Sequence, residues 1–200
     1  MYQWQLQSAK QRFGNWIVML YDSNIEENKE LKNHPYLNES GKASIDNYVY
    51  EEGECTDIKV GYMTDEFLRI GNISLQCGRM PEKDDEAAIE WDSLIKLNQG
   101  TQIGQEIHIE VRQGSSQTTE TIEKTYKLTG ILTNYTNVWN GGEYIPGIVV
   151  TEGEGEAVNR IGKAAYIYSS NNYINNYRDI YDGLVKKTHK ELIYNSEGSF

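Results

Sequence analysis

The sequence predicts an α+β fold in which strand-helix-strand units at the two chain ends form one layer, with a β-rich segment inserted between them. Both ends alternate short apolar runs with helical spacing, whereas strand patterns dominate the middle. The chain has 200 residues, of which 38% are hydrophobic and 24% charged, as is typical of a folded protein. We therefore expect segments 1–62 and 163–200 to form an α+β subdomain and segment 63–162 to form a β-rich subdomain, with the termini side by side.

The first segment begins with a short helix and a buried strand. Apolar residues run together between positions 15 and 21 without helical gaps, which favours a strand. Asp22, Ser23 and Asn24 can cap a following helix, and Pro35 disfavours helical geometry at the residue before it. The expected elements are a helix over 2–12, a strand over 15–21, a helix over 25–33, and strands over 45–51 and 56–62.

The middle segment is expected to be mostly strands. Ile107, Ile109 and Val111 alternate with polar residues, which indicates a half-buried strand, and the run 121–134 is its expected hairpin partner across a loop at 114–117. The acidic, glycine-rich run 152–156 is predicted to be a mobile turn. The expected elements are helices over 64–70 and 92–98 and strands over 73–77, 87–91, 105–113, 121–134 and 145–151.

The last segment repeats the strand-helix-strand order. Ile174, Tyr177 and Leu184 lie at helical spacing and predict the longest helix, over 171–189. A strand over 163–169 precedes this helix, a short strand over 192–195 follows it, and the tail 196–200 is expected to be loose.

Charge and motif content exclude several classes of function. The formal net charge of −11 argues against nucleic acid, because phosphate contacts require clustered lysine and arginine. His34, His108 and His189 form no pair at metal-ligand spacing. The sequence also lacks a nucleophile elbow and a phosphate-binding loop, so we expect no enzymatic activity and no cofactor.

Two features leave alternatives open. Tyr135, Trp139 and Tyr144 flank an Asn-Gly-Gly turn and suit either a sugar-binding loop or a hairpin that packs on itself. Cys55 and Cys77 can form a bridge in an oxidising compartment or remain two separate, partly buried thiols, since spacing alone does not place their Cβ atoms.

A turn at Gly78-Arg79-Met80-Pro81 is the most informative local motif. Gly78 permits a backbone angle that other residues resist, and Pro81 fixes the exit of the turn. Arg79 can pair with Glu86 across the turn. We interpret Gly78, Arg79, Pro81 and Glu86 as a structural signature of the fold and not as a catalytic site.

The stretch from position 61 to 89, which carries this turn, resembles the core of MacB-like periplasmic domains in ABC-transporter permeases of the MacB/FtsX type. The family pattern of a short helix ending in glycine, a strand, a Gly-Arg-x-Pro turn and an acidic residue before a strand is present here. The tripeptides Ile-Gly-Gln at 103–105 and Thr-Gly-Ile at 129–131 also look like the corresponding motifs of the family. The segment 11–16 is similar to the one that follows the first membrane helix of Gram-positive permeases.

The resemblance implies a porter-like α+β subdomain with an inserted β-rich subdomain, on the extracytoplasmic side of the cell membrane. It implies membrane helices on both sides of the chain, a second permease domain and a cytoplasmic ATPase subunit as partners. The domain would couple ATP hydrolysis to transport or signalling, acting on an extracellular peptide, lipoprotein or cell-wall enzyme. The alternative is a free-standing secreted module that binds carbohydrate or peptide, or a hydrolase, with the aromatic loop near Asn140 as its site.

Overall fold

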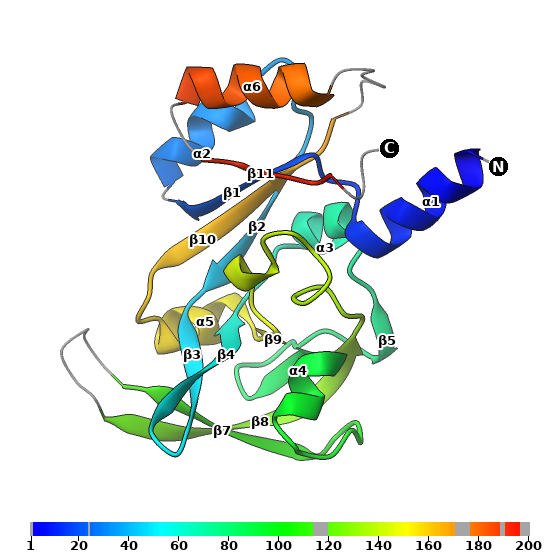
Figure 1. The fold of residues 1–200 in the computed structure, drawn as a ribbon. Helices are drawn as coiled ribbons and strands as arrows, with labels where there is room; N and C mark the ends of the chain where they lie inside the picture. The colour runs from blue at the N-terminus through cyan, green and yellow to red at the C-terminus, as the bar shows by residue number, and fades with distance from the viewer. Residues whose placement is uncertain (1, 24, 114–119, 171–176, 189–190, 197–200) are drawn as a thin grey trace.

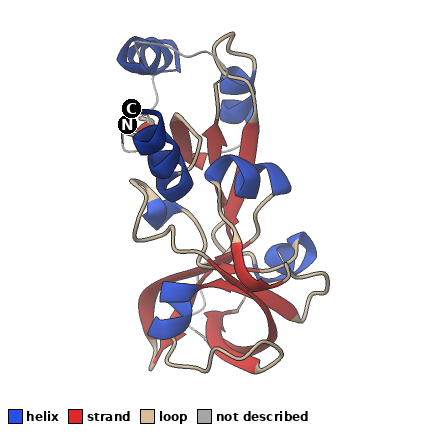
Figure 2. Cartoon of the chain, turned by 90° about the vertical axis from the view of Figure 1, so that its right-hand side faces the viewer, coloured by secondary structure: helices blue, strands red, loops and turns tan. Residues whose placement is uncertain are grey.

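The chain folds into two sheets arranged end to end along the long direction of the molecule (Figures 1 and 2). The computed structural model describes residues 2–23, 25–113, 120–170, 177–188 and 191–196. The expected loop at 114–117, the start of the expected 171–189 helix and most of the expected tail 196–200 lie outside the described residues. Mixed helices and strands confirm the predicted α+β class.

The first sheet is antiparallel, has four strands and joins the two ends of the chain. Its order is β11-β1-β10-β2. The strands are β1 (Val18–Ser23), β2 (Ser40–Ile45), β10 (Lys163–Tyr168) and β11 (Ile193–Tyr194).

Helices cover both faces of this sheet. One face carries α2 (Ile25–Lys32) and α6 (Tyr177–Thr188), and α3 (Asp65–Gly71) packs against β2 and β10 on the other (Figure 1). The N-terminal helix α1 (Tyr2–Phe13) ends beside β11. Asn195 Nδ2 donates to the carbonyls of Phe13 (3.1 Å) and Trp16 (2.9 Å), so the last strand is fixed next to the end of α1.

The second sheet has seven strands in the order β5-β8-β6-β9-β4-β3-β7. Strand β7 also pairs with β8, so six of these strands close into a barrel and β5 extends along β8. The strands are β3 (Asn47–Glu51), β4 (Glu54–Gly61), β5 (Leu75–Gly78), β6 (Glu86–Glu90), β7 (Glu106–Arg112), β8 (Thr121–Leu132) and β9 (Ile148–Val149). Closure pairs each of these six strands on both sides, and alternate side chains of β7 are buried, as its sequence alternation predicts.

The chain passes from the first sheet to the second before the expected boundary after residue 62. Strands β3 and β4 pair in the barrel, so the chain passes from the first sheet to the second at Asp46. The predicted strand over 45–51 is in fact the end of β2, a crossing residue and β3. Strand β2 escaped detection because its residues, Ser-Gly-Lys-Ala-Ser-Ile, are mostly small or polar. The division into subdomains 1–62 plus 163–200 and 63–162 remains a proposal.

The prediction of a mobile turn over 152–156 is wrong. These residues begin helix α5 (Glu152–Val158), and Thr151 caps it by accepting a hydrogen bond from the Glu154 amide (3.2 Å). Two glutamates in the first turn interact favourably with the positive end of the helix dipole, which offsets the low helix propensity of the glycines.

Helix α4 (Trp91–Lys96) follows β6 close to its predicted position. None of the helices that the structure describes is long and apolar enough to cross a membrane.

Candidate functional site: the junction between the two sheets

The two sheets meet where β2 continues into β3. The segment after β4 runs back along β2 on its way to α3 and bonds to it. The Ser44 amide donates to the Tyr62 carbonyl, the Asp46 amide to the Val60 carbonyl, and the Thr64 amide to the Lys42 carbonyl, each at 2.9 Å. Thr64 Oγ1 then caps α3. The crossing is therefore a backbone-bonded structure and not a free linker.

Asp46 lies buried at this crossing, with 2% of its surface exposed. Its carboxylate accepts hydrogen bonds from Ser44 Oγ (2.6 Å) and Asn159 Nδ2 (3.0 Å). Its carbonyl accepts from the amide of Arg160 (2.8 Å). Burial raises the pKa of Asp46 to about 6, although the Ser44 hydrogen bond and the charge of Lys42 act against the shift. One side chain thus joins the β2–β3 crossing to the segment that leads from α5 to β10.

A single hydrophobic cluster fills the space between the sheets. Trp139 is its centre, with ring centroids 5.6 Å from Trp16, 6.2 Å from Phe67 and 6.0 Å from Tyr135. Ala165 and Ile167 reach it from the first sheet, and the barrel strands contribute residues such as Ala88, Leu132 and Val149. The two sheets therefore share one packed interior, and such interiors resist deformation.

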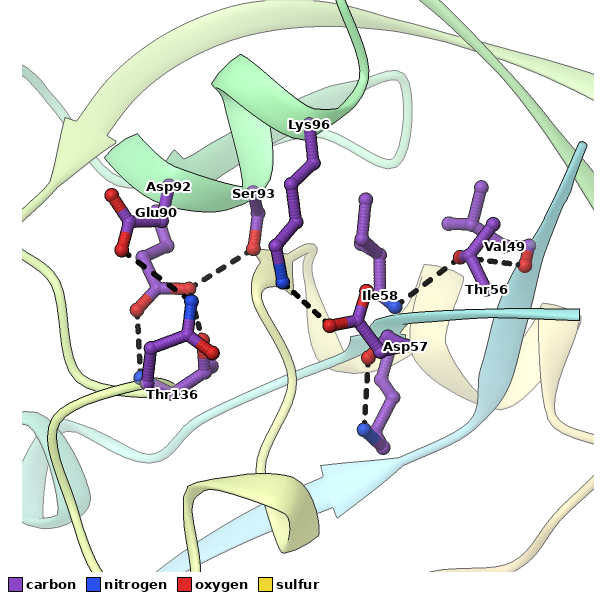
Figure 3. A network of polar contacts seen from close by, with 11 residues as sticks. Val49, Thr56, Asp57, Ile58, Glu90, Asp92, Ser93, Lys96 and Thr136 are labelled. Carbon is purple, nitrogen blue, oxygen red and sulfur yellow. Dashed lines mark hydrogen bonds and ion pairs between the residues drawn. The ribbon is translucent and has the colours of Figure 1, made fainter.

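Glu90 holds the loop that carries Trp139 (Figure 3). Its fully buried carboxylate accepts hydrogen bonds from the amides of Tyr135 (2.6 Å) and Thr136 (2.7 Å). The hydroxyls of Thr136 (2.6 Å) and Ser93 (3.0 Å) donate to its second oxygen. Four donors satisfy the charge without a cation, which explains how a carboxylate is tolerated at the end of β6.

The aromatic loop does not present a sugar-binding platform. Tyr135 and Trp139 are buried, with 1% and 6% of their surfaces exposed, and Tyr135 Oη donates to the Pro146 carbonyl (2.8 Å). Tyr144 stacks on Tyr21 at a centroid distance of 4.1 Å. These rings pack inward, but mostly on other elements, such as Trp16 and Phe67, so the expected hairpin that packs on itself is not formed either.

The turn at Gly78-Arg79-Met80-Pro81 lies in the barrel, between β5 and β6. Gly78 has a φ of +79°, and a Cβ there would collide with the Thr129 carbonyl, so the turn needs glycine. The expected ion pair is present and bidentate, with Arg79 Nη2 2.6 Å and Nη1 2.8 Å from the two oxygens of Glu86. The Glu82 amide also donates to Glu86 (2.9 Å). These hydrogen bonds, Arg79 foremost, lower the pKa of Glu86 to about 2.

Other candidate groups are structural. Cys55 and Cys77 are both free and exposed, which rules out a bridge between them and also differs from the partly buried thiols of the second alternative. His108 lies on the outside of β7, 3.2 Å from a Glu123 oxygen, while His189 is outside the described residues. Within the described ranges, no three histidine, cysteine, aspartate or glutamate side chains are placed to hold a metal ion.

Sequence reasoning missed both buried carboxylates of the junction. Asp46 sits in a run where every second residue is polar, and Glu90 is an acid between Ile89 and Trp91. An acid inside an apolar strand pattern is a signal for a buried carboxylate, and Glu90 carries it. Asp46 has no such signal, because its burial depends on contacts with residues more than 100 positions away.

Comparison with known proteins places the fold. No family model matches the sequence, and no curated protein matches it. The periplasmic region of MacB from Actinobacillus actinomycetemcomitans matches with a TM-score of 0.50 and 8% identity, over 96% of this chain and 94% of that one. A domain of a putative permease from Porphyromonas gingivalis has a TM-score of 0.43 at 12% identity, over 93% and 89%. The extracellular domain of the ABC-type transporter YknZ from Gram-positive bacteria has a TM-score of 0.45 at 12% identity, over 90% and 99%. This chain therefore has a fold similar to that of the periplasmic region of MacB over nearly its whole length.

Proposed function

We propose that this chain is the extracytoplasmic domain of a bacterial ABC-transporter permease of the MacB/FtsX type, from a Gram-positive organism, and that it relays movement without catalysing a reaction. Its partners in this proposal are its own membrane helices, a second permease domain and a cytoplasmic ATPase subunit. An extracellular peptide, lipoprotein or cell-wall enzyme would receive the movement. The full-length likeness in fold to the MacB periplasmic region supports this assignment.

The observation that carries the proposal is that the first and last strands of the described chain are neighbours in one sheet. Strands β1 and β11 are hydrogen-bonded neighbours, and Asn195 fixes the last strand to the end of α1. Membrane helices attached at two close points would move this sheet as a body. The shared core around Trp139 would then carry the barrel with it.

The full gene provides the first test. The proposal expects an apolar segment of roughly 20 residues shortly before Tyr2 and another soon after Phe200. The alternative, a free-standing secreted binding module or hydrolase, expects a cleaved leader and no membrane segment. Protease accessibility on intact cells then decides on which side of the membrane the domain lies.

Rigid-body relay has a separate test in the full transporter with its ATPase. Spin labels on Cys55 in β4 and on Lys29→Cys in α2, with Cys77→Ser, report the distance between the two sheets by double electron–electron resonance. We expect one narrow distance that ATP does not change, and a broader distribution in Trp139→Ala. Trp91→Ala is the matched control, because Trp91 is an exposed tryptophan on α4. An ATP-dependent change of this distance in the unmutated core would refute the relay.

A further inference from the structure

A groove of about 490 Å³ is lined by residues of β2, α2 and α3. Strand β2 is the outer strand of its sheet, with α2 and α3 on opposite faces (Figure 1). On the α2 side, Tyr166 and Tyr168 of β10 form its floor, and Lys42 lies opposite Tyr166 in the ladder. Tyr168 Oη donates to Asn28 Oδ1 (2.6 Å), which holds α2 over this floor. The volume is in the range of pockets that hold small molecules.

Positive charge gathers on the α2 side of this groove. Lys32 and Lys42 line it, and neither forms an ion pair with a carboxylate in the described part of the chain. Lys42 Nζ bonds only the neutral Tyr62 hydroxyl (2.7 Å). The third cation, Arg69, is on the α3 side and is paired with Glu39 at 2.8 Å. Lys32 and Lys42 therefore form no salt bridge next to the tyrosines, while the carboxylate of Glu66 lines the groove on the α3 side.

Tyr166 adds a hydrogen-bond donor to the floor of the groove. Only 5% of the residue is exposed, it lines the groove, and its hydroxyl makes no hydrogen bond to a described residue. Burial raises the pKa of Tyr166, so the hydroxyl stays protonated. An anion in the groove would therefore meet a protonated hydroxyl that can donate a hydrogen bond to it.

We propose that this groove binds a small solute that carries an oxyanion group on an unsaturated or apolar body. Lys32 and Lys42 would take the charge, the Tyr166 hydroxyl would donate to the anion, and the tyrosine rings with Leu37 would pack on the body of the solute. The overall charge of −11 does not prevent this, because salt screens exposed charges beyond roughly 8 Å at physiological ionic strength. The inference does not depend on the proposed transporter role.

The test is a titration of the ¹⁵N-labelled domain with phenyl phosphate and with benzoate, followed by amide chemical shifts. Benzyl alcohol is the neutral control ligand. We expect saturable shifts at 37–42, 64–69 and 166–168 with at least one of the two anions, and none with the alcohol. The anion that binds more tightly identifies a phosphate or a carboxylate as the recognised group.

Variants separate a built site from general attraction. We expect Lys32→Gln and Lys42→Gln each to weaken binding about fivefold, and Tyr166→Phe to weaken it about threefold. Lys127→Gln, an exposed lysine on β8, is the matched control and should leave the affinity unchanged. Lys32 is exposed on α2, so its variant keeps the test valid if Lys42→Gln disturbs the fold. The proposal is refuted by unsaturable shifts up to about 20 mM anion, by equal binding of the alcohol, or by an equal effect of Lys127→Gln.

Discussion

Replacing Asp46 with asparagine should remove a pH dependence of stability that the junction imposes. Burial raises the pKa of this carboxyl from 3.8 to about 6, so the folded state binds the proton more tightly than the unfolded chain. For a carboxyl whose pKa is raised, folding loses stability as the pH rises from the unfolded value through the folded one. The difference between the folded and unfolded pKa values corresponds to roughly 3 kcal/mol of lost stability at pH 7.5. Roughly 1.4 kcal/mol of this stability returns when the pH is lowered to 5.

Asparagine keeps the shape of the side chain and can still accept from Asn159 Nδ2. The measurement is urea unfolding of both proteins at a series of pH values between 5 and 7.5, followed by fluorescence of Trp16 and Trp139 in the shared core. We expect the free energy of unfolding of Asp46→Asn, relative to that of the parent, to rise by about 1.4 kcal/mol from pH 5 to pH 7.5. Lys42 and Glu156 also act on this carboxyl, but both proteins contain them. Parallel pH profiles for the two proteins would refute the assignment.

Three further substitutions test the packing and the turn. Trp139→Ala should lower the free energy of unfolding by about 3–5 kcal/mol in urea, because it leaves a cavity in the shared core. Gly41→Ala should cost about 1–3 kcal/mol in the same assay, since its Cβ would collide with the backbone of Phe67 and push α3 off the sheet; an unchanged midpoint would contradict this contact. Glu86→Gln should lower the thermal midpoint at neutral pH. The difference in midpoint between this variant and the parent should shrink as the pH falls from 4.5 towards 2, because the parent then loses its own ion pair with Arg79.

Local patterns predicted most elements because each depends on near neighbours in sequence. The alternation around Ile109 gave β7 and its hairpin partner β8 at nearly their observed positions. Thr64 followed by two acids predicted the start of α3, and the structure shows Thr64 as its cap. The Arg79–Glu86 pair was predictable for the same reason, since the two residues flank one turn.

The elements that sequence reasoning missed are fixed by distant contacts. Strand β2 has little β propensity of its own and forms because β10 pairs along its whole length. Helix α5 contains two glycines, and its Glu154 is buried against Lys124 Nζ (2.9 Å) and Tyr126 Oη (2.8 Å), which lie on β8. These partners are about 30 residues away, so no local pattern reports them.

The turn motif and the junction differ in the same way, because the turn depends on local contacts and the junction on distant ones. The Gly78 turn is local, exposed and confined to the barrel, whereas Asp46, Glu90 and Trp139 come together from well-separated parts of the chain. The proposed relay requires stiffness where the two sheets meet. The buried carboxylates of Asp46 and Glu90 contribute to it, because each accepts several hydrogen bonds. Because Asp46 lies at the crossing and burial raises its pKa to about 6, the stability of the junction should itself depend on pH. A mildly acidic medium would then strengthen the connection between the sheets, which is the opposite of the usual acid weakening of paired carboxylates such as Glu86.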